Sequence, residues 1–348
     1  MKIALVGRVA EDKELFDGQT IKTRLLYDLL KEIDQVYLVD TYEYRKHIFS
    51  ILIKSIKALV TCDVLVMSIS INGRKVFFPF FYYLNKIFQK NIYHALIGGR
   101  LANNINENPN WKKYVNSFKI NWVESHELIS DLKRIGVSNA VYLPNFKRLN
   151  PVQLKENHEY QYIYKYCMFS RIQKKKGISD AIEAINGINK KYQCIKAKLD
   201  IYGPIDKTYE TEFFQMLNKY KDFIEYKGVV NSSESVDTIK DYFMLLFPTR
   251  YYNEGIPGTI IDAMAAGVPV IARKWHFCSE ILEHKQNSYI YEFDKPDDLF
   301  QMIDYSINNS LEVEGMKANC IVKSREYMFE SAFEIINDEL TKIMETYK

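Results

Sequence analysis

Short apolar, β-branched runs alternate with amphipathic stretches from the first residue of the chain onward. An apolar run of about four to eight residues favours a buried strand, and an apolar position every third or fourth residue favours a helix with one buried face. Regular alternation of the two is typical of parallel sheets covered by crossover helices. The pattern therefore predicts an α/β protein built from Rossmann-like sheets.

The apolar runs fall into two series, which predicts two domains. Strands of the first series are expected at residues 2–6, 36–40, 64–68, 92–97, 122–124 and 140–143, with a helix at 20–32 among those between them. Strands of the second series are expected at residues 166–170, 199–202, 224–226, 244–247, 268–272 and 288–291, and residues 324–347 read as helical. A polar segment at 144–161, which contains Pro144 and Pro151, is the expected linker.

The composition is that of a soluble globular chain of 348 residues, of which 47% are hydrophobic and 26% charged. Five widely spaced cysteines without a C-x-x-C pair suggest neither a disulfide framework nor a zinc site, and they fit a reducing cytoplasm. The N-terminal apolar run soon meets Glu11 and Asp12 and is too short for a signal peptide or a membrane span. A cytoplasmic protein is expected.

Basic residues gather in the first half of the chain. Residues 1–150 carry 22 Lys and Arg against 14 Asp and Glu, whereas residues 151–348 carry 25 against 30. Residues 51–100 hold seven basic side chains and only one acid, Asp63. This imbalance favours an anionic surface or substrate as a partner of the first domain. No nucleic-acid partner is expected, because no basic run or nucleic-acid module is present.

Two segments of the first half are unusually apolar for surface helices. In residues 44–59, one helical face carries Ile48, Leu52, Ile56 and Leu59, and the opposite side carries Lys46, Lys54 and Lys57. Residues 76–88 hold seven aromatic side chains, and Lys75, Lys86 and Lys90 lie among or beside them. Both segments resemble basic helices that lie at a membrane interface, but ordinary helices that cover a sheet are the favoured interpretation, because such helices must bury an apolar face anyway.

The segment most indicative of chemistry lies at residues 247–272. After an expected strand, a loop rich in Gly and Pro leads into a helix that begins near Thr259, and Gly267 ends that helix. The free N–H groups of a helix N-terminus bind anions. Glu254 in the loop and Asp262 in the helix can both face a ligand, although acids near a helix N-terminus can also be purely structural.

A second strand end carries basic residues, in the loop 169–179. Arg171 and Lys176 can hold a diphosphate between a guanidinium fork and a mobile ammonium group, and Ser179 can cap the helix that follows. A basic loop alone is often only a solvated turn. Its combination with the Glu254 segment strengthens the functional interpretation.

Together these two segments resemble retaining glycosyltransferases of family 4 (glycosyl transferases group 1), which have the GT-B fold and build bacterial surface polysaccharides. Shorter segments also resemble the family, and they occur in the same order along the chain. They are residues 17–24, which resemble the family's glycine loop, and residues 97–100, 123–125, 143–146 and 201–204. The resemblance implies two Rossmann-like domains facing across a cleft, with the acceptor bound by residues 1–150 and the nucleotide-sugar by 151–325. We expect the helix at 326–348 to return to the first domain.

The resemblance also implies residue roles. Arg171, Lys176 and Glu254 would be catalytic, the first two on the donor diphosphate and Glu254 on sugar hydroxyls. Asp262 would bind the ribose, where the family commonly has Glu. The other implied donor-binding residues are Gly18, Gln19, Thr20, Gly203, Gly255, Ile256, Pro257, Gly258 and Thr259. Further candidates are His94, Gly98, Gly99, Trp275 and Glu280; a histidine at a strand end such as His94 is more often structural, and Trp275 could equally pack in the core.

The implied reaction moves a hexose from a UDP- or GDP-sugar, with retention of configuration, to a saccharide or polyprenyl-diphosphate-linked acceptor. No metal and no cofactor are expected, and the inner membrane surface is a further expected partner of a peripheral enzyme. Two alternatives stay open: a catalytically silent glycan- or lipid-binding subunit, and a sugar-nucleotide epimerase with the same fold. Dehydrogenase and P-loop nucleotidase functions are excluded, because neither glycine motif is present.

Overall fold

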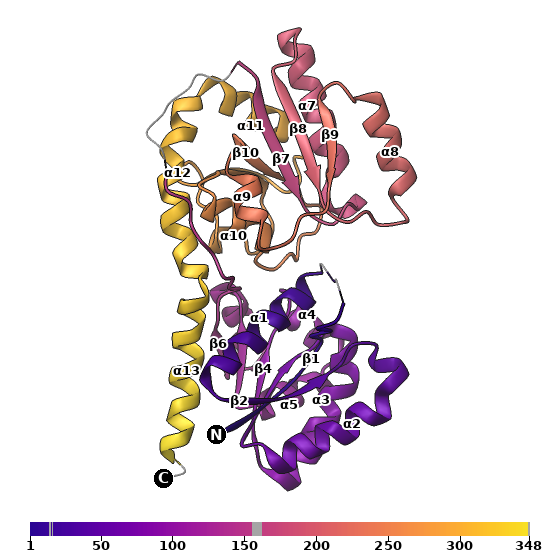
Figure 1. The fold of residues 1–348 in the computed structure, drawn as a ribbon, viewed down its shortest axis with the longest axis vertical. Coiled ribbons are helices and arrows are strands. Elements are labelled where there is room, and N and C mark those ends of the chain that lie inside the picture. Colours follow the sequence, from indigo (N-terminus) through magenta and orange to yellow (C-terminus); the bar gives the residue numbers. More distant parts are fainter. Residues whose placement is uncertain (14, 16, 155–161, 347–348) are drawn as a thin grey trace. The chain divides into compact units, whose positions relative to one another are not determined.

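A computed structural model describes the chain except for residues 14, 16, 155–161 and 347–348 (Figure 1). It divides into two compact units, one formed by residues 1–147 with 328–348 and the other by residues 148–327. The domain boundaries expected from the sequence were 150 and 325. Most of the segment expected to be the linker is described, and residues 155–161 of it lie outside the described part.

Unit 1 is built on a parallel sheet of six strands in the order β2-β1-β3-β4-β5-β6. Its strands are β1 (Lys2–Gly7), β2 (Gln35–Asp40), β3 (Val64–Ser68), β4 (Asn91–Ala95), β5 (Ile120–Val123) and β6 (Ala140–Tyr142). Its helices are α1 (Gly18–Ile33), α2 (Tyr44–Thr61), α3 (Ile71–Phe88), α4 (Leu101–Glu107), α5 (Asn110–Ser117), α6 (His126–Arg134) and α13 (Phe329–Thr346). Strand β1 is central and buried, as expected for its unbroken apolar run.

Unit 2 repeats this architecture, with strand order β12-β11-β10-β7-β8-β9. Its strands are β7 (Tyr164–Phe169), β8 (Ala197–Tyr202), β9 (Ile224–Gly228), β10 (Met244–Phe247), β11 (Val270–Arg273) and β12 (Ser288–Tyr291). Its helices are α7 (Ile178–Tyr192), α8 (Glu210–Lys219), α9 (Ser235–Ile239), α10 (Gly258–Ala265), α11 (Asp298–Asn308) and α12 (Ser310–Ser324). The predicted α/β class with two Rossmann-like sheets is confirmed.

Helices α1 and α13 pack together on one face of the unit 1 sheet. Leu26 and Leu30 of α1 share a buried cluster with Ala332, Ile336 and Leu340 of α13. The C-terminal helix, yellow in Figure 1, thus completes the core of the first unit although it lies last in the chain. Its burial on the sheet supplies the apolar contact that an isolated helix lacks.

The sequence pattern predicted a helix from residue 324 to 347, but the helix at the C-terminus begins later than that. Helix α12 ends at Ser324, a short 3-10 turn covers Arg325–Tyr327, and α13 begins only at Phe329. Between them Met328 forms an isolated parallel bridge with Lys147. This strand-like pairing interrupts the helical backbone at the point where the chain passes from unit 2 to unit 1.

Helix α2 covers the sheet with a face that matches the expected one only in part, since Leu59 is buried and Ile48 and Leu52 are half-buried. Its buried residues are Ile51, Ser55, Ala58 and Leu59, whereas Ile56, which was assigned to the buried face, is 39% exposed. The small side chains of Ser55 and Ala58 allow the helix to approach the sheet closely. A non-helical backbone at His47 (φ −120°, ψ 22°) also breaks the register of the first turn.

Candidate active site

The basic loop of unit 2 follows strand β7 and is held against the segment that follows β10. A 3-10 turn covers Lys174–Lys176, and the amide of Arg250 donates to the Lys175 carbonyl at 2.8 Å. Gly177 ends the turn with φ +72°, and a Cβ there would lie 2.0 Å from the carbonyl oxygen of Pro248. Only glycine fits this close approach. Arg171 lies exposed earlier in the loop.

This packing brings Lys176 and Glu254 together across 78 residues of sequence. Lys176 Nζ lies 2.6 Å from Glu254 Oε2, and the two side chains are only 16% and 18% exposed. The hydroxyl of Thr249 donates to the same carboxylate oxygen at 3.3 Å. A partly buried ion pair of this kind places one cation and one hydrogen-bond acceptor side by side, ready for a ligand that carries both phosphate and hydroxyl groups.

Glu254 is followed by the loop that leads into α10. Residues Gly255 and Pro257 are half-buried, Ile256 is buried, and α10 begins at Gly258 without a side-chain cap. The Thr259 hydroxyl is buried and has no hydrogen-bond partner among the described residues. An uncapped helix N-terminus directs partial positive charge toward its surroundings. Asp262 lies in the next turn of α10 and is 5% exposed.

Trp275 supports this loop from beneath. Its indole Nε1 donates to the Gly255 carbonyl at 3.1 Å, and its ring packs edge-on against Phe247 at 5.3 Å. The side chain is 1% exposed, so it belongs to the core and shapes the loop from inside. Glu280 lies farther along the chain, in a 3-10 turn, and its carbonyl accepts from the Tyr327 hydroxyl at 3.1 Å.

Gly203 lies at the end of β8, beside the start of the basic loop. Its φ is +130°, and a Cβ would lie 1.9 Å from the carbonyl oxygen of Ser170. Its amide donates to the Gly228 carbonyl at 2.8 Å. The residue therefore allows the backbone after β8 to pass close to the backbone after β7.

Asp180, which was not predicted from the sequence, organises the same region. Arg273 Nη2 and Arg250 Nε lie 3.0 and 3.1 Å from Asp180 Oδ2. The carboxylate in the first turn of α7 thus joins the ends of β10 and β11. Ser179 was expected to cap this helix, but α7 begins at Ile178 after Gly177, and Ser179 instead accepts from Arg250 Nη2 at 3.1 Å. An acid directly after a basic loop was the available signal for Asp180.

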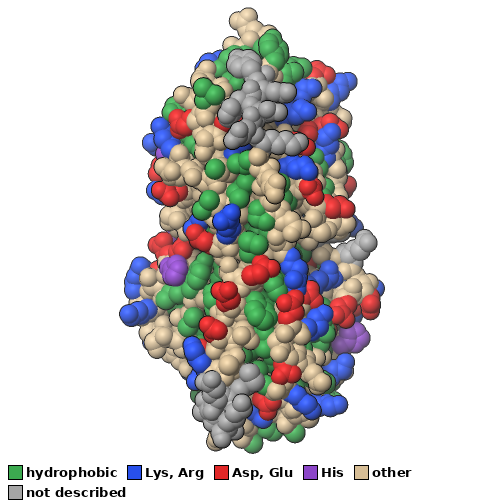
Figure 2. All heavy atoms as spheres, turned by 60° about the vertical axis from the view of Figure 1, so that its left-hand side comes forward, with side chains coloured by type: hydrophobic (Ala, Val, Ile, Leu, Met, Phe, Trp, Pro, Cys, Tyr) green, Lys and Arg blue, Asp and Glu red, His purple; other side chains and the backbone are tan. Residues whose placement is uncertain are grey.

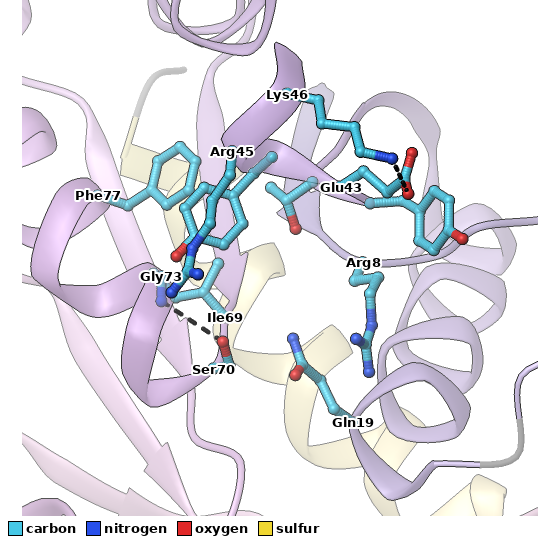
Figure 3. Close-up of a pocket in the computed structure, with 12 residues that line it drawn as sticks. Arg8, Gln19, Glu43, Arg45, Lys46, Ile69, Ser70, Gly73 and Phe77 are labelled. Atoms are coloured by element: carbon cyan, nitrogen blue, oxygen red, sulfur yellow. Dashed lines mark hydrogen bonds and ion pairs between the residues drawn. The ribbon is translucent and has the colours of Figure 1, made fainter. Parts of the chain in front are cut away.

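In unit 1, the start of α1 borders a pocket of about 470 Å³. Asp17 caps the helix by accepting from the Thr20 amide at 3.2 Å and from the Thr20 hydroxyl at 2.9 Å, and it forms an ion pair with Arg8. Thr20 is buried and Gly18 is exposed. Gln19 and Arg8 line the pocket from α1 and from the loop after β1, as Figure 3 shows.

The opposite wall of the pocket comes from the starts of α2 and α3. It combines cationic and aromatic side chains, among them Arg45, Lys46, Tyr44 and Phe77. Glu43 forms an ion pair with Lys46 at 2.7 Å. A pocket lined by both cations and aromatic rings suits a ligand that has an anionic group and an apolar or sugar-ring surface.

The loop that carries Gly98 and Gly99 rests on buried cations that sequence analysis did not identify. Lys22 Nζ donates to the Leu96 carbonyl at 2.8 Å and pairs with Glu124, and Arg74 Nη2 donates to the Ile97 carbonyl at 3.0 Å. Burial lowers the pKa of Arg74 to about 10, so it stays charged at neutral pH. Gly98 has φ +78°. The matches at 17–24 and 123–125 contained Lys22 and Glu124, but nothing in them indicated that the two meet.

His94 lies inside the unit 1 core. It is fully buried, its Nδ1 lies 3.1 Å from Asn121 Oδ1, and Phe78 packs edge-on against its ring at 5.0 Å. Burial and the nearby Arg74 hold the pKa of the imidazole well below its usual value. A neutral, enclosed histidine serves packing, so the structural alternative is favoured over contact with a substrate.

The described residues contain no group of three or more His, Cys, Asp or Glu side chains arranged to hold a metal ion. Within the same part of the chain, no helix combines the length and the apolar character needed to cross a bilayer.

Several solved structures share this fold over almost the whole chain. Anabaena Alr3699/HepE in complex with UDP-glucose superimposes with a TM-score of 0.75 and 14% identity, covering 98% of this chain and 100% of the other. Sucrose-phosphate synthase from Thermosynechococcus elongatus superimposes with a TM-score of 0.75 and 13% identity, and 99% of each chain is covered. The lipopolysaccharide outer core galactosyltransferase WaaB superimposes with a TM-score of 0.67 and 14% identity, covering 98% of this chain and 99% of the other. No curated protein sequence matches this chain.

The family model for glycosyl transferases group 1 matches residues 151–327, which is almost all of unit 2. This range contains the basic loop, the Lys176–Glu254 pair and the start of α10. With the GT-B fold established by the solved structures, the chain belongs to the glycosyl transferases group 1 family.

Proposed function

We propose that the protein is a retaining, metal-independent hexosyltransferase that uses a UDP- or GDP-sugar. The observation that carries this proposal is the 2.6 Å contact between Lys176 and Glu254 beside the uncapped N-terminus of α10. A nucleotide-sugar presents a diphosphate next to a ring of hydroxyl groups. The paired cation and carboxylate match these two chemical features.

In the proposed donor complex, Arg171 and Lys176 bind the diphosphate and Glu254 accepts hydrogen bonds from sugar hydroxyls. The backbone from Gly255 to Thr259 supplies amides, and the unpartnered Thr259 hydroxyl supplies a further polar contact. Asp262 takes the ribose hydroxyls through the small part of the residue that is exposed.

The proposed reaction is a substitution on one face of the sugar. The bond from the anomeric carbon to the diphosphate oxygen breaks as the acceptor oxygen bonds to the same face of that carbon, and the departing phosphate oxygen takes the acceptor proton. Negative charge grows on the diphosphate, where Lys176 and Arg171 stabilise it. No enzymic base is required, which agrees with the burial of His94.

We place the acceptor at the unit 1 pocket beside Arg45; Gln19, which the resemblance assigns to the donor, lines the same pocket. Its mixture of cations and aromatic rings suits a saccharide or a polyprenyl-diphosphate-linked saccharide. A cytoplasmic role in surface polysaccharide or lipopolysaccharide assembly is consistent with the similarity to WaaB, a lipopolysaccharide outer core galactosyltransferase.

Calorimetric titration with UDP, GDP and their hexose conjugates, with and without a chelator, tests the donor assignment. We expect one nucleotide series to bind equally well with chelator present.

Lys176→Ala should reduce sugar transfer on the order of 10²-fold, whereas Lys174→Ala, a change at an exposed neighbouring residue, should leave sugar transfer near the wild-type rate. Donor binding without transfer to any acceptor would favour the silent-subunit alternative, and donor isomerisation would favour the epimerase.

A further inference from the structure

Helix α2 has a second apolar face that points to solvent. Phe49, Ile53, Ile56 and Val60 are spaced at intervals of four, three and four residues, so they form one stripe along the helix. They are 81%, 67%, 39% and 58% exposed. The buried face is formed by other residues of the helix, centred on Ser55, so the stripe is not needed to cover the sheet.

The charged residues within α2 and α3 are all basic, and acids lie only at the ends of α2, where Glu43 pairs with Lys46 before the helix and Asp63 follows it. Helices α2 and α3, which are neighbours on the sheet, contain no Asp or Glu. Lys54 and Lys57 follow Ile53 and Ile56 directly in the chain. Beyond α2, the end of α3 adds Lys86 and two exposed apolar side chains, Tyr83 and Ile87.

Two other exposed surfaces differ from this one. The face shown in Figure 2 has basic and acidic side chains interspersed. Helix α12 also exposes two large apolar residues, Leu311 and Val322, but it carries Glu312, Glu314 and Lys317 as well. Isolated apolar residues amid mixed charges are normal on a protein surface. A stripe of four on a helix whose own charged residues are all basic is not.

We propose that α2 docks on an anionic lipid bilayer, with the stripe from Phe49 to Val60 inserted at the level of the headgroups. An amphipathic helix binds such an interface through buried apolar area and through the attraction of its cations to anionic lipids. The stripe supplies the first contribution, and Lys54 and Lys57 supply the second. This inference goes beyond the proposed transfer reaction and does not depend on it.

Vesicle co-sedimentation tests the docking directly, with full-length protein and no substrate. We expect binding to vesicles of phosphatidylglycerol and phosphatidylethanolamine, little binding to phosphatidylcholine, and weaker binding at high salt. The variant Phe49→Gln/Ile53→Gln/Val60→Gln removes exposed side chains only and should weaken binding at least ten-fold. Lys54→Glu/Lys57→Glu should weaken binding to anionic vesicles selectively.

The matched control is Leu311→Gln/Val322→Gln on α12, which removes equally exposed apolar side chains and should bind like wild type. Circular dichroism and the thermal midpoint verify that each variant is folded. The proposal is overturned if wild-type protein does not bind anionic vesicles, or if the stripe variant binds them as well as wild type does. Light scattering that finds a wild-type dimer and a monomeric stripe variant also overturns it, since the face would then be a contact between two copies.

Discussion

Lys176 Nζ and Glu254 Oε2 lie 2.6 Å apart, in two loops that follow different strands of the unit 2 sheet. Both side chains are largely shielded, so the attraction between them is less screened by solvent than that of a surface pair. Each charge therefore stabilises the other in its partly buried position. Removing one leaves the other partly buried without its partner charge.

A double-mutant cycle measures this coupling. Lys176→Met and Glu254→Gln should each lower stability, and the double variant should lose less than the sum, because the cost of a lone buried charge is counted in both single variants. We expect a coupling energy of about 1–3 kcal/mol from urea denaturation. Strictly additive effects would show that the two charges do not interact in solution.

Gly177 should tolerate no side chain. Gly177→Ala would place a Cβ 2.0 Å from a backbone carbonyl oxygen, at a left-handed φ of +72°. We expect a loss of stability of more than about 1 kcal/mol and weaker donor binding, because the basic loop must move. Gly315→Ala is the control. That glycine lies inside α12 with open space around it, so alanine should stabilise by up to about 1 kcal/mol.

Trp275→Phe keeps an aromatic ring beneath the donor loop but removes the hydrogen bond to the Gly255 carbonyl. We expect donor affinity to fall several-fold, in line with about 0.5–1.5 kcal/mol for a lost hydrogen bond. Trp122→Phe is the matched change in unit 1, since the buried Trp122 Nε1 has no hydrogen-bond partner among the described residues. Equal effects of both variants on donor affinity would contradict the assigned role.

His94 should make the protein less stable in mild acid. The pKa of the buried imidazole is held well below its usual value of about 6.5, so the unfolded chain takes up a proton that the folded chain refuses. Stability should therefore fall as pH drops below about 6.5, by at most about 1.4 kcal/mol per pH unit. Above that pH neither state is protonated, and this contribution is constant.

Urea denaturation of wild type and His94→Gln at pH 7.5 and 5.5 checks this. The variant should lose clearly less stability between the two pH values than wild type does. His47→Gln, at an exposed position on α2, controls for the loss of a histidine elsewhere. An acid loss in His94→Gln as large as in wild type would show that other groups cause it.

The candidate site was only partly predictable from the chain. The loops of Lys176 and Glu254 could be recognised because strand ends followed by Gly and basic residues are local patterns. Asp180 was missed, because its partners Arg250 and Arg273 lie 70 and 93 residues away and meet it only through the sheet order. The interior position of His94 also depends on neighbours contributed by α3 and β5.

The sequence by itself determined the α/β class, the two series of strands and the position of strands such as Val64–Ser68 and Met244–Phe247. Each of these follows from a local run of apolar residues. Tertiary structure decided which side of α2 meets the sheet, because the helix is apolar on two sides and the side that carries Ser55 and Ala58 is the one buried. It also decided that Met328 pairs with Lys147 and that Lys176 reaches Glu254. Such choices depend on contacts between distant segments, which local periodicity does not encode.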